Sequence, residues 1–410
     1  MKTVRKTTKL EGVGYDIRGP VADEAARMTA EGVDIISLNT GNPARFDLFA
    51  PKFIEDAFVA GLRGAEGYSD SQGIPEATGA ICAYSAFKGI EGVTPADVYT
   101  GNGVSELIGI ALQALLDNGD EILIPTPDYP LWTSIATLCG GAVMHYTCDE
   151  EAGWLPDIAD IKKKVTPRTK AIVIINPNNP TGALYPKENL LEILQVAREN
   201  ELVVFADEIY DRLVMDGLTH YSCAALAPDL FTITFNGLSK SHMIAGFRCG
   251  WMCVSGAKSR AKDYIEGIQM LASMRLCANV PAQSVIKAAL DKPFSAAPLL
   301  APGGRLYEQR EFIWRAVSDI PGLSAVKPQA AFYLFPKIDK KKFSIIDDEQ
   351  FVLDFLHEHH VLLTHGRGFN WPDTDHFRIV YLPELPELRV IAKRLAVFLE
   401  SYQQVGGNGK

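Results

Sequence analysis

Short runs of consecutive apolar residues, each followed by a longer stretch of helical pattern, dominate the middle of the chain. The runs stand at residues 98–103, 121–129, 171–177, 202–210, 231–237 and 248–254. Strands that alternate with helices predict a parallel sheet in an α/β fold. Because the apolar residues follow one another instead of alternating with polar ones, helices are expected on both faces of that sheet.

A change in the sequence near residue 291 predicts a second, smaller domain. A segment rich in proline and glycine at residues 297–304 precedes a predicted long helix to about Ile320, and short strands and helices are expected to follow. We expect a large domain over residues 43–295, with a mostly parallel sheet covered by helices. Residues 1–42 and 296–410 are expected to form a smaller α+β domain together.

Composition narrows the class of protein. The 410 residues are 47% hydrophobic and 22% charged, which is typical of a globular protein large enough for two domains. The net charge of -10 is spread along the chain, so no nucleic-acid partner is expected. No apolar run approaches the roughly 20 residues that cross a bilayer, so no membrane partner is expected either.

Cysteine and histidine spacing excludes two further classes of site. The seven cysteines are scattered and form no CxxC pair, which indicates reduced thiols and a cytoplasmic protein. His357, His359 and His360 lack the spacing of two histidines one helical turn apart around a glutamate. We therefore expect no metal site.

Polar residues follow the apolar runs at the strand ends where open α/β sheets bind their ligands. Lys240 follows one run, and Asp207 ends another, where a buried carboxylate needs a cation such as a protonated pyridine nitrogen. Tyr210 and Asn179 could donate hydrogen bonds to an oxygen on the same ring. The alternatives are a surface lysine and a tight turn at Asn179 and Pro180.

A phosphate site is predicted beside these residues. The segment GNGVSE at residues 101–106 joins a strand to a helix, and amide groups at a helix N-terminus bind phosphate. Ser239 and Arg248 could complete this site, because arginine grips phosphate oxygens with parallel hydrogen bonds. The alternative is a helix cap next to a surface arginine.

The motifs NPNNPTG, ADEIY and SKSHMIAGFRCGW resemble those of the class I aminotransferases, which are fold-type I pyridoxal-phosphate enzymes. The resemblance covers nearly the whole chain. YDIRGP, GNGVSELI, PDYPLW, TFNGLSK and DHFRIVYLP are similar to the group of bacterial glutamate-pyruvate (alanine) aminotransferases. This resemblance implies pyridoxal 5'-phosphate as cofactor and ping-pong transfer of an amino group between L-alanine or L-glutamate and the 2-oxo acids pyruvate and 2-oxoglutarate.

The resemblance also implies a role for each matching residue. Lys240 would carry the cofactor and move the proton, and Arg378 would hold the substrate carboxylate, helped by Gly41 and Asn179. Tyr68 would reach the phosphate from a partner subunit, which implies a homodimer with shared active sites. The remaining cofactor contacts would come from Gly103, Val104, Ser105, Tyr129, Asn179, Asp207, Tyr210, Ser239 and Arg248.

Several residues could determine which amino acid the protein prefers. Tyr15 and Arg18 are candidates for a wall that accepts both the methyl group of alanine and the distal carboxylate of glutamate, or they belong to an arm at a dimer interface. His242, Met243 and Arg367 depart from the bacterial relatives. If Arg367 borders the pocket, another amino acid could be preferred.

Two other classes of protein are alternatives. The same scaffold serves lyases and oxidases that use this cofactor. A DNA-binding regulator would need a module that the roughly forty residues before the sheet domain do not supply.

Overall fold

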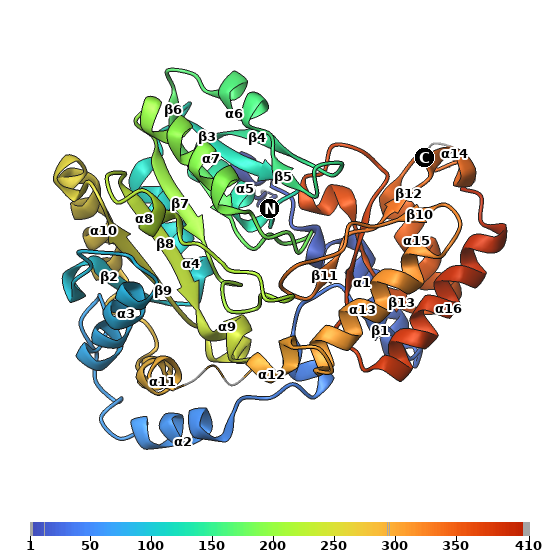
Figure 1. Cartoon of the computed structure of the whole chain (residues 1–410), viewed down its shortest axis with the longest axis horizontal. Coiled ribbons are helices and arrows are strands. Elements are labelled where there is room, and N and C mark those ends of the chain that lie inside the picture. Colours follow the sequence, from blue (N-terminus) through green and yellow to red (C-terminus); the bar gives the residue numbers. More distant parts are fainter. Residues whose placement is uncertain (1–2, 12, 293, 295, 405–410) are drawn as a thin grey trace.

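The computed structural model describes residues 3–11, 13–292, 294 and 296–404, which form two lobes side by side (Figure 1). One lobe is built on an eight-stranded sheet of strand order β2-β9-β8-β7-β6-β3-β4-β5. Its strands are β2 (Val98–Asn102), β3 (Glu121–Thr126), β4 (Ala142–Asp149), β5 (Leu155–Pro156), β6 (Thr169–Ile175), β7 (Val203–Asp207), β8 (Thr232–Gly237) and β9 (Cys249–Ser255).

The sheet is mostly parallel, as predicted. Strands β4, β3, β6, β7 and β8 run parallel to their neighbours in that order. β9 is antiparallel to both β8 and β2, and the short β5 is antiparallel to β4. The carboxyl ends of the parallel strands therefore meet at one edge, where Asp207 closes β7 and Lys240 follows β8.

Both faces of the sheet are covered by helices. In β6, Ile172 and Ile174 pack with α6 (Ile158–Lys164) and α7 (Lys187–Glu199) on one face. Ala171 and Val173 pack with α4 (Val104–Leu115), α5 (Leu131–Leu138) and α10 (Lys262–Met274) on the other. Each fully buried isoleucine stabilises the fold by roughly 1.5–3 kcal/mol, which explains why these strands are apolar on consecutive residues.

A third layer covers the edge formed by β2 and β9. Helices α2 (Lys52–Gly61), α3 (Pro75–Phe87) and α11 (Val280–Leu290) pack there around Trp251. Short helices α8 (Cys223–Leu226) and α9 (Leu238–Ser241) follow β7 and β8 along the chain.

The second lobe combines helices with short strands. Its core is shared by α1 (Pro20–Ala30), α13 (Arg305–Ser318), α15 (Asp348–His359) and α16 (Leu385–Ser401), which carry buried side chains such as Ile313 and Leu388. The strands are β1 (Ile36–Ser37), β10 (Leu323–Ser324), β11 (Tyr333–Leu334), β12 (Lys337–Ile338), β13 (Val361–Leu362), β14 (Thr364–His365) and β15 (Phe377–Val380). Short helices α12 (Ala297–Leu300) and α14 (Lys340–Phe343) complete the lobe.

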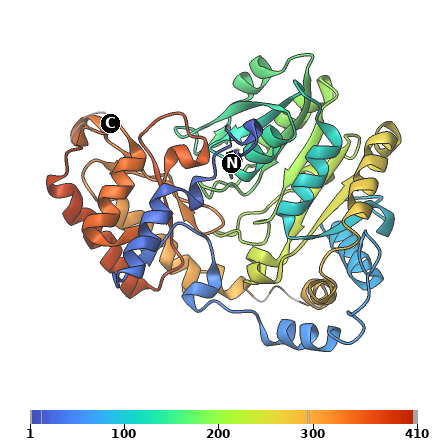
Figure 2. The same ribbon diagram turned by 180° about the vertical axis from the view of Figure 1, so that it is seen from behind.

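The N-terminal segment contacts both lobes. Helix α1 lies among the helices of the C-terminal half (Figure 2), and Ile36 of β1 pairs with Val361 of β13. Residues before α1 instead pack on the sheet lobe, where Ile17 joins a core and the carbonyl of Gly14 accepts a hydrogen bond from Ser134 Oγ at 2.8 Å. The expected domain boundary at residue 295 lies outside the described residues.

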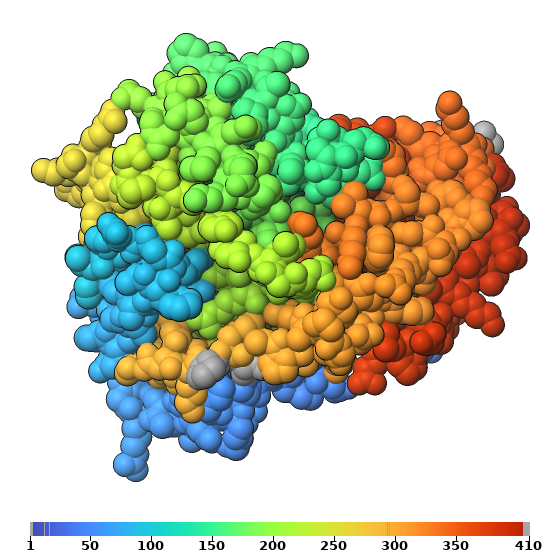
Figure 3. Space-filling model, viewed as in Figure 1, coloured from blue at the N-terminus to red at the C-terminus, as the bar shows by residue number. Residues whose placement is uncertain are grey.

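The two lobes abut along a shared boundary (Figure 3). Asn370 Nδ2 donates to Asp128 Oδ1 at 2.5 Å, and the Asp128 amide donates to the carbonyl of Phe369 at 3.0 Å. Lys337 Nζ donates to Glu150 Oε2 at 2.7 Å, and His376 Nε2 lies 3.4 Å from Glu150 Oε1. Within the described part of the chain, no helix is both long and apolar enough to cross a membrane.

Candidate active site

A cavity of about 720 Å³ lies where the carboxyl ends of the sheet strands face the second lobe. Among the described residues that line it, Asp207 is the only acidic one, whereas Arg18, Lys240, Arg248 and Arg378 are basic. A cavity with such an excess of positive charge attracts anionic ligands. The other lining residues from the sequence prediction are Tyr15, Gly41, Val104, Ser105, Tyr129, Asn179, Tyr210 and Ser239.

Lys240 lies on the one-turn helix α9, directly after β8. Its Nζ donates to the carbonyl of Gly41 at 2.9 Å, and no carboxylate pairs with it within the described residues. Burial, together with nearby Arg378 and Arg248, lowers the pKa of Lys240 to about 8. The amine therefore loses its proton more readily than an exposed lysine does, as a nucleophile or general base requires.

Asp207 is a buried carboxylate at the end of β7. It accepts hydrogen bonds from Trp132 Nε1 at 3.0 Å and from the Ile209 amide at 3.3 Å, but no described side chain offers it a cation. Burial raises the pKa of Asp207 to about 6, with a smaller contribution from Glu208. A cationic ring nitrogen beside Asp207 would restore the charged form.

Arg378 is a buried cation without a carboxylate partner in the described part of the structure. Its side chain reaches the cavity from β15 and is 2% exposed. It donates to Asn179 Oδ1 at 2.9 Å and to the carbonyl of Asn39, while its Nε has no partner. Burying an unpaired guanidinium costs several kcal/mol, so a carboxylate ligand suits this position.

Tyr333 and Tyr210 stand next to Arg378. Their hydroxyl groups are hydrogen-bonded at 2.6 Å, and the Arg378 guanidinium lies 4.6 Å from the centre of the Tyr333 ring. Burial raises the pKa of Tyr210 well above its ordinary value, so the hydroxyl stays protonated and can donate a hydrogen bond. Tyr333 was missed by sequence reasoning, because its neighbours in AFYLFP make it look like an ordinary core residue.

The N-terminus of α4 and Arg248 form one corner of the cavity. Gly103 has a φ of 79°, and a Cβ at this position would collide with the guanidinium of Arg248. Arg248 itself has a φ of 58° and donates to the carbonyls of Asn102 at 3.2 Å and Ala245 at 3.1 Å. With Ser239 on the same wall, this corner supplies amide, hydroxyl and guanidinium donors suited to a phosphate group.

Tyr15 and Tyr129 form another wall. Their hydroxyl groups are 2.7 Å apart, and the rings meet edge to face with centroids 6.3 Å apart. Gly41 also lines the cavity, and a Cβ at this position would overlap the hydroxyl of Tyr333. Arg18 is exposed at the cavity.

Four residues singled out in the sequence lie away from the cavity. Tyr68 is 82% exposed on the surface. Arg367 pairs with Asp347 and Asp348 at the start of α15, so its charge is neutralised outside the cavity and it does not border the pocket. His242 and Met243 are buried, and Ser241 Oγ lies 2.9 Å from His242 Nδ1.

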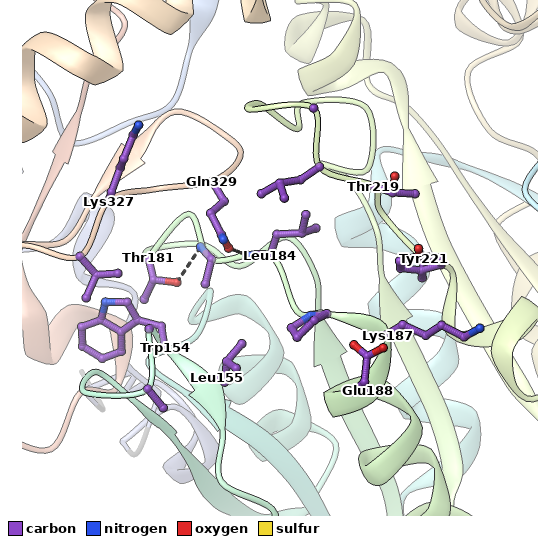
Figure 4. A pocket seen from close by; sticks show the side chains of 17 residues that line it. Trp154, Leu155, Thr181, Leu184, Lys187, Glu188, Thr219, Tyr221, Lys327 and Gln329 are labelled. Atoms are coloured by element: carbon purple, nitrogen blue, oxygen red, sulfur yellow. Dashed lines mark hydrogen bonds between the residues drawn. The ribbon is translucent and has the colours of Figure 1, made fainter.

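A second pocket, of about 490 Å³, lies between the lobes, with Thr181 and Leu184 of one lobe and Gln329 of the other in its lining (Figure 4). There Gln329 Oε1 accepts a hydrogen bond from the Leu184 amide at 3.2 Å. None of the predicted site residues lines this pocket. It is a seam between the lobes, and the chemistry is expected in the larger cavity.

Comparisons with known proteins agree with this geometry. The family model of aminotransferase class I and II matches residues 33–395. The chain is 54% identical to the glutamate-pyruvate aminotransferase AlaA of Escherichia coli strain K12, over 99% of this chain and 100% of the relative. It is 52% identical to the alanine aminotransferase of Mycobacterium bovis, over 97% of this chain and 93% of the relative.

A solved structure shows the same architecture. The alanine aminotransferase of Pyrococcus furiosus superposes with a TM-score of 0.91 at 40% identity, covering 97% of this chain and 100% of the other. The fold-type I architecture expected from the sequence is thus confirmed. The chain belongs to the class I and II aminotransferase family.

Proposed function

We propose that this protein is a pyridoxal-phosphate-dependent alanine aminotransferase. It would exchange amino groups between L-alanine or L-glutamate and the 2-oxo acids pyruvate and 2-oxoglutarate, in a ping-pong reaction. The observation that supports this most directly is the cavity itself: among its described lining residues, Asp207 is the one carboxylate, and Lys240, Arg248 and Arg378 have no carboxylate partner. The substrates are inferred from the names of the relatives.

The residues of the cavity suit the cofactor. Asp207 would meet the ring nitrogen, Tyr210 and Asn179 the ring oxygen, and Tyr129 the ring face. Ser239, Arg248 and the amides of residues 103–105 would hold the phosphate. When bound, the cofactor accepts the electron pair left on the substrate Cα as its proton departs.

The protein would hold and move the substrate proton. Arg378, with Asn179 and the backbone of Gly41, would orient the α-carboxylate and so direct Cα toward Lys240. The Lys240 amine, with its lowered pKa, would take the proton from Cα and later return it as the acid. The walls formed by Tyr15, Tyr129 and Tyr333 would limit the access of water.

Tyr15 and Arg18 are our candidates for selectivity between alanine and glutamate. Arg18 reaches the cavity from a segment before α1, and Tyr15 is hydrogen-bonded to Tyr129. The Arg18 guanidinium is suited to a distal carboxylate. Arg18→Ala should then lower kcat/KM for L-glutamate more than for L-alanine.

We further propose a cytoplasmic homodimer. Residues 49–68 expose Phe49, Val59, Leu62 and Tyr68, a density of apolar side chains that suits a subunit contact. Tyr68 would act in the partner's active site. All seven cysteines are free, as expected of a reducing compartment.

A panel of amino donors tested against pyruvate and 2-oxoglutarate, scored by kcat/KM, examines the proposed reaction. We expect L-alanine with 2-oxoglutarate and L-glutamate with pyruvate to be the best pairs, with parallel double-reciprocal plots. Lys240→Ala should abolish turnover, whereas Lys170→Ala, a surface lysine near Asp120, should not. Release of ammonia or peroxide without an aminated acceptor would indicate a lyase or an oxidase instead.

A further inference from the structure

Lys88 is buried between two carboxylates, which stand one and four residues after the end of β7. Its Nζ donates to Asp211 Oδ2 at 2.7 Å and to Glu208. The side chains of Lys88, Glu208 and Asp211 are only 10%, 1% and 3% exposed. Lys88 caps the end of α3, which Figure 1 places at the sheet edge formed by β2 and β9.

The same carboxylates tie several elements together. Asp211 Oδ2 also accepts hydrogen bonds from Tyr84 at 2.6 Å and from Asn236 Nδ2 at 2.9 Å. Glu208 Oε1 accepts from Ser222 Oγ at 2.8 Å and from the Cys223 amide at 3.1 Å. The cluster thus joins α3 and α8 to the ends of β7 and β8.

Those two strand ends present the proposed catalytic groups. Asp207 precedes Glu208 directly, and Tyr210 precedes Asp211 directly, while Asn236 stands four residues before Lys240. Any shift of the segment from Asp207 to Asp211 therefore changes how Asp207 and Tyr210 meet a ligand in the cavity.

The cluster also sets the charge beside Asp207. Burial alone would raise the pKa of Asp211, but Lys88, together with His220 and Tyr84, outweighs it and holds this pKa at about 2. The cluster of Lys88, Glu208 and Asp211 carries two carboxylates and one ammonium group. Also facing it are Tyr84, His220 and Arg212, whose Nε donates to the Tyr84 hydroxyl at 3.1 Å.

We infer that Lys88 is a positioning residue of the active site. It holds the segment from Asp207 to Asp211 in place, and its positive charge offsets part of the negative charge of this segment. Both effects determine where, and in what electrostatic environment, Asp207 meets the cofactor ring. This inference rests on the proposed function, because the ring is that of pyridoxal phosphate. The role of Lys88 is indirect, since it does not line the cavity.

The test compares charge variants by the affinity for pyridoxal phosphate and by the pH midpoint of the absorbance change of the bound cofactor. Lys88→Met leaves one more uncompensated negative charge near the ring, which favours protonated forms. We expect its midpoint to rise by about one pH unit, which is a tenfold change in the protonation equilibrium. We expect its affinity to fall by about tenfold, because the segment that carries Asp207 and Tyr210 loses its hydrogen bonds to Lys88.

Two further variants separate charge from packing. Asp211→Asn removes a negative charge while Lys88 keeps Glu208 as partner, so the midpoint should fall below that of the parent. The double variant that combines Lys88→Met with Asp211→Asn has the net charge of the parent. Its midpoint should therefore return most of the way to the parent value. Lys258→Met, which breaks an ion pair with Asp97 away from the cavity, should leave both readouts unchanged.

The outcomes are distinguishable. If the parent protein binds no pyridoxal phosphate, the proposed function fails before Lys88 is tested. Unchanged midpoints in Lys88→Met and Asp211→Asn would overturn the inference, and so would equal shifts of the same sign in both. If Lys88→Met does not fold, the direction of the midpoint shift in Asp211→Asn and in the double variant, each relative to the parent, still tests the inference.

Discussion

Arg378 stands out among single residues because its guanidinium is buried and has no carboxylate partner among the residues that the structure describes. Arg378→Lys keeps the charge but removes the planar pair of donors that matches a carboxylate. We expect kcat/KM to fall about 100-fold for every amino acid and 2-oxo acid, which corresponds to about 3 kcal/mol. Steady-state kinetics with both substrate pairs measures this.

Arg367 offers a matched control from the same lobe. It is also an arginine, but its partners are Asp347 and Asp348, outside the cavity. Arg367→Lys keeps a positive charge beside Asp347 and the buried Asp348, and it leaves the cavity unchanged, so kcat/KM should stay within about twofold. A larger loss in Arg367→Lys than in Arg378→Lys would contradict the proposed carboxylate site.

Sequence reasoning found those cavity residues that lie next to strand ends or within family motifs. Asp207, Lys240 and Asn179 follow apolar runs, and a polar group in that position stands out. Trp132 and Tyr333 could not be found in this way, because an aromatic residue in an apolar segment usually fills a core. Only the folded chain shows that their polar atoms face Asp207 and Tyr210.

At the scale of elements, the end of β3 is tied to the segment after β14. Asn370 Nδ2 donates to Asp128, whose pKa is raised to about 6 by burial, and Thr126 Oγ1 donates to the carbonyl of Asn370 at 2.6 Å. Tyr129 follows Asp128 directly, and Arg378 lies on β15, which pairs with β14. The link therefore sets the spacing between two walls of the cavity.

Asn370→Ala should loosen that link. Leaving a buried carboxylate without its amide donor costs about 1–3 kcal/mol, so we expect a lower melting temperature. We also expect kcat/KM to fall by about tenfold, mainly through KM. Asn189→Ala, which removes an amide that bonds only the carbonyl of Pro156 on the sheet lobe, should cost stability without changing KM. Equal kinetic losses in both variants would count against the link.

The strands themselves were largely predictable. Six apolar runs correspond to β2, β3, β6, β7, β8 and β9, because fully buried strands require consecutive apolar residues. The sequence did not reveal β4, whose residues are mixed in polarity and only partly buried. Nor did it reveal that β9 runs antiparallel, since apolarity does not encode the direction of a strand.

At the scale of the whole molecule, His376 joins the two lobes. Its ring lies between Asp375 at 2.7 Å and Glu150 of the sheet lobe at 3.4 Å, with Lys337 on the same glutamate. Burial alone would lower the pKa of His376, but Asp375 and Glu150 outweigh it and raise this pKa above its ordinary value. The protonated ring therefore stabilises the contact between the lobes.

This contact should weaken as the pH rises. A pKa raised by folding gives stability that is complete below the unfolded pKa of about 6.5 and is lost as the pH rises through the folded value. We expect His376→Gln to unfold at lower urea concentration than the parent at pH 6, and the difference to shrink by pH 9. His357→Gln, on the exposed end of α15, is the control. A gap between His376→Gln and the parent that does not change with pH would contradict this role.

Because of the excess of cations around the cavity, the stability of the folded protein should depend on the concentration of anionic ligands. The positive charges of Lys240, Arg248 and Arg378 line one cavity and repel one another. An anion that binds there reduces this repulsion and so stabilises the folded protein. A ligand at a hundred times its Kd adds about 2.7 kcal/mol to the free energy of unfolding. The resistance of this protein to proteolysis should therefore rise with the concentration of its anionic ligands.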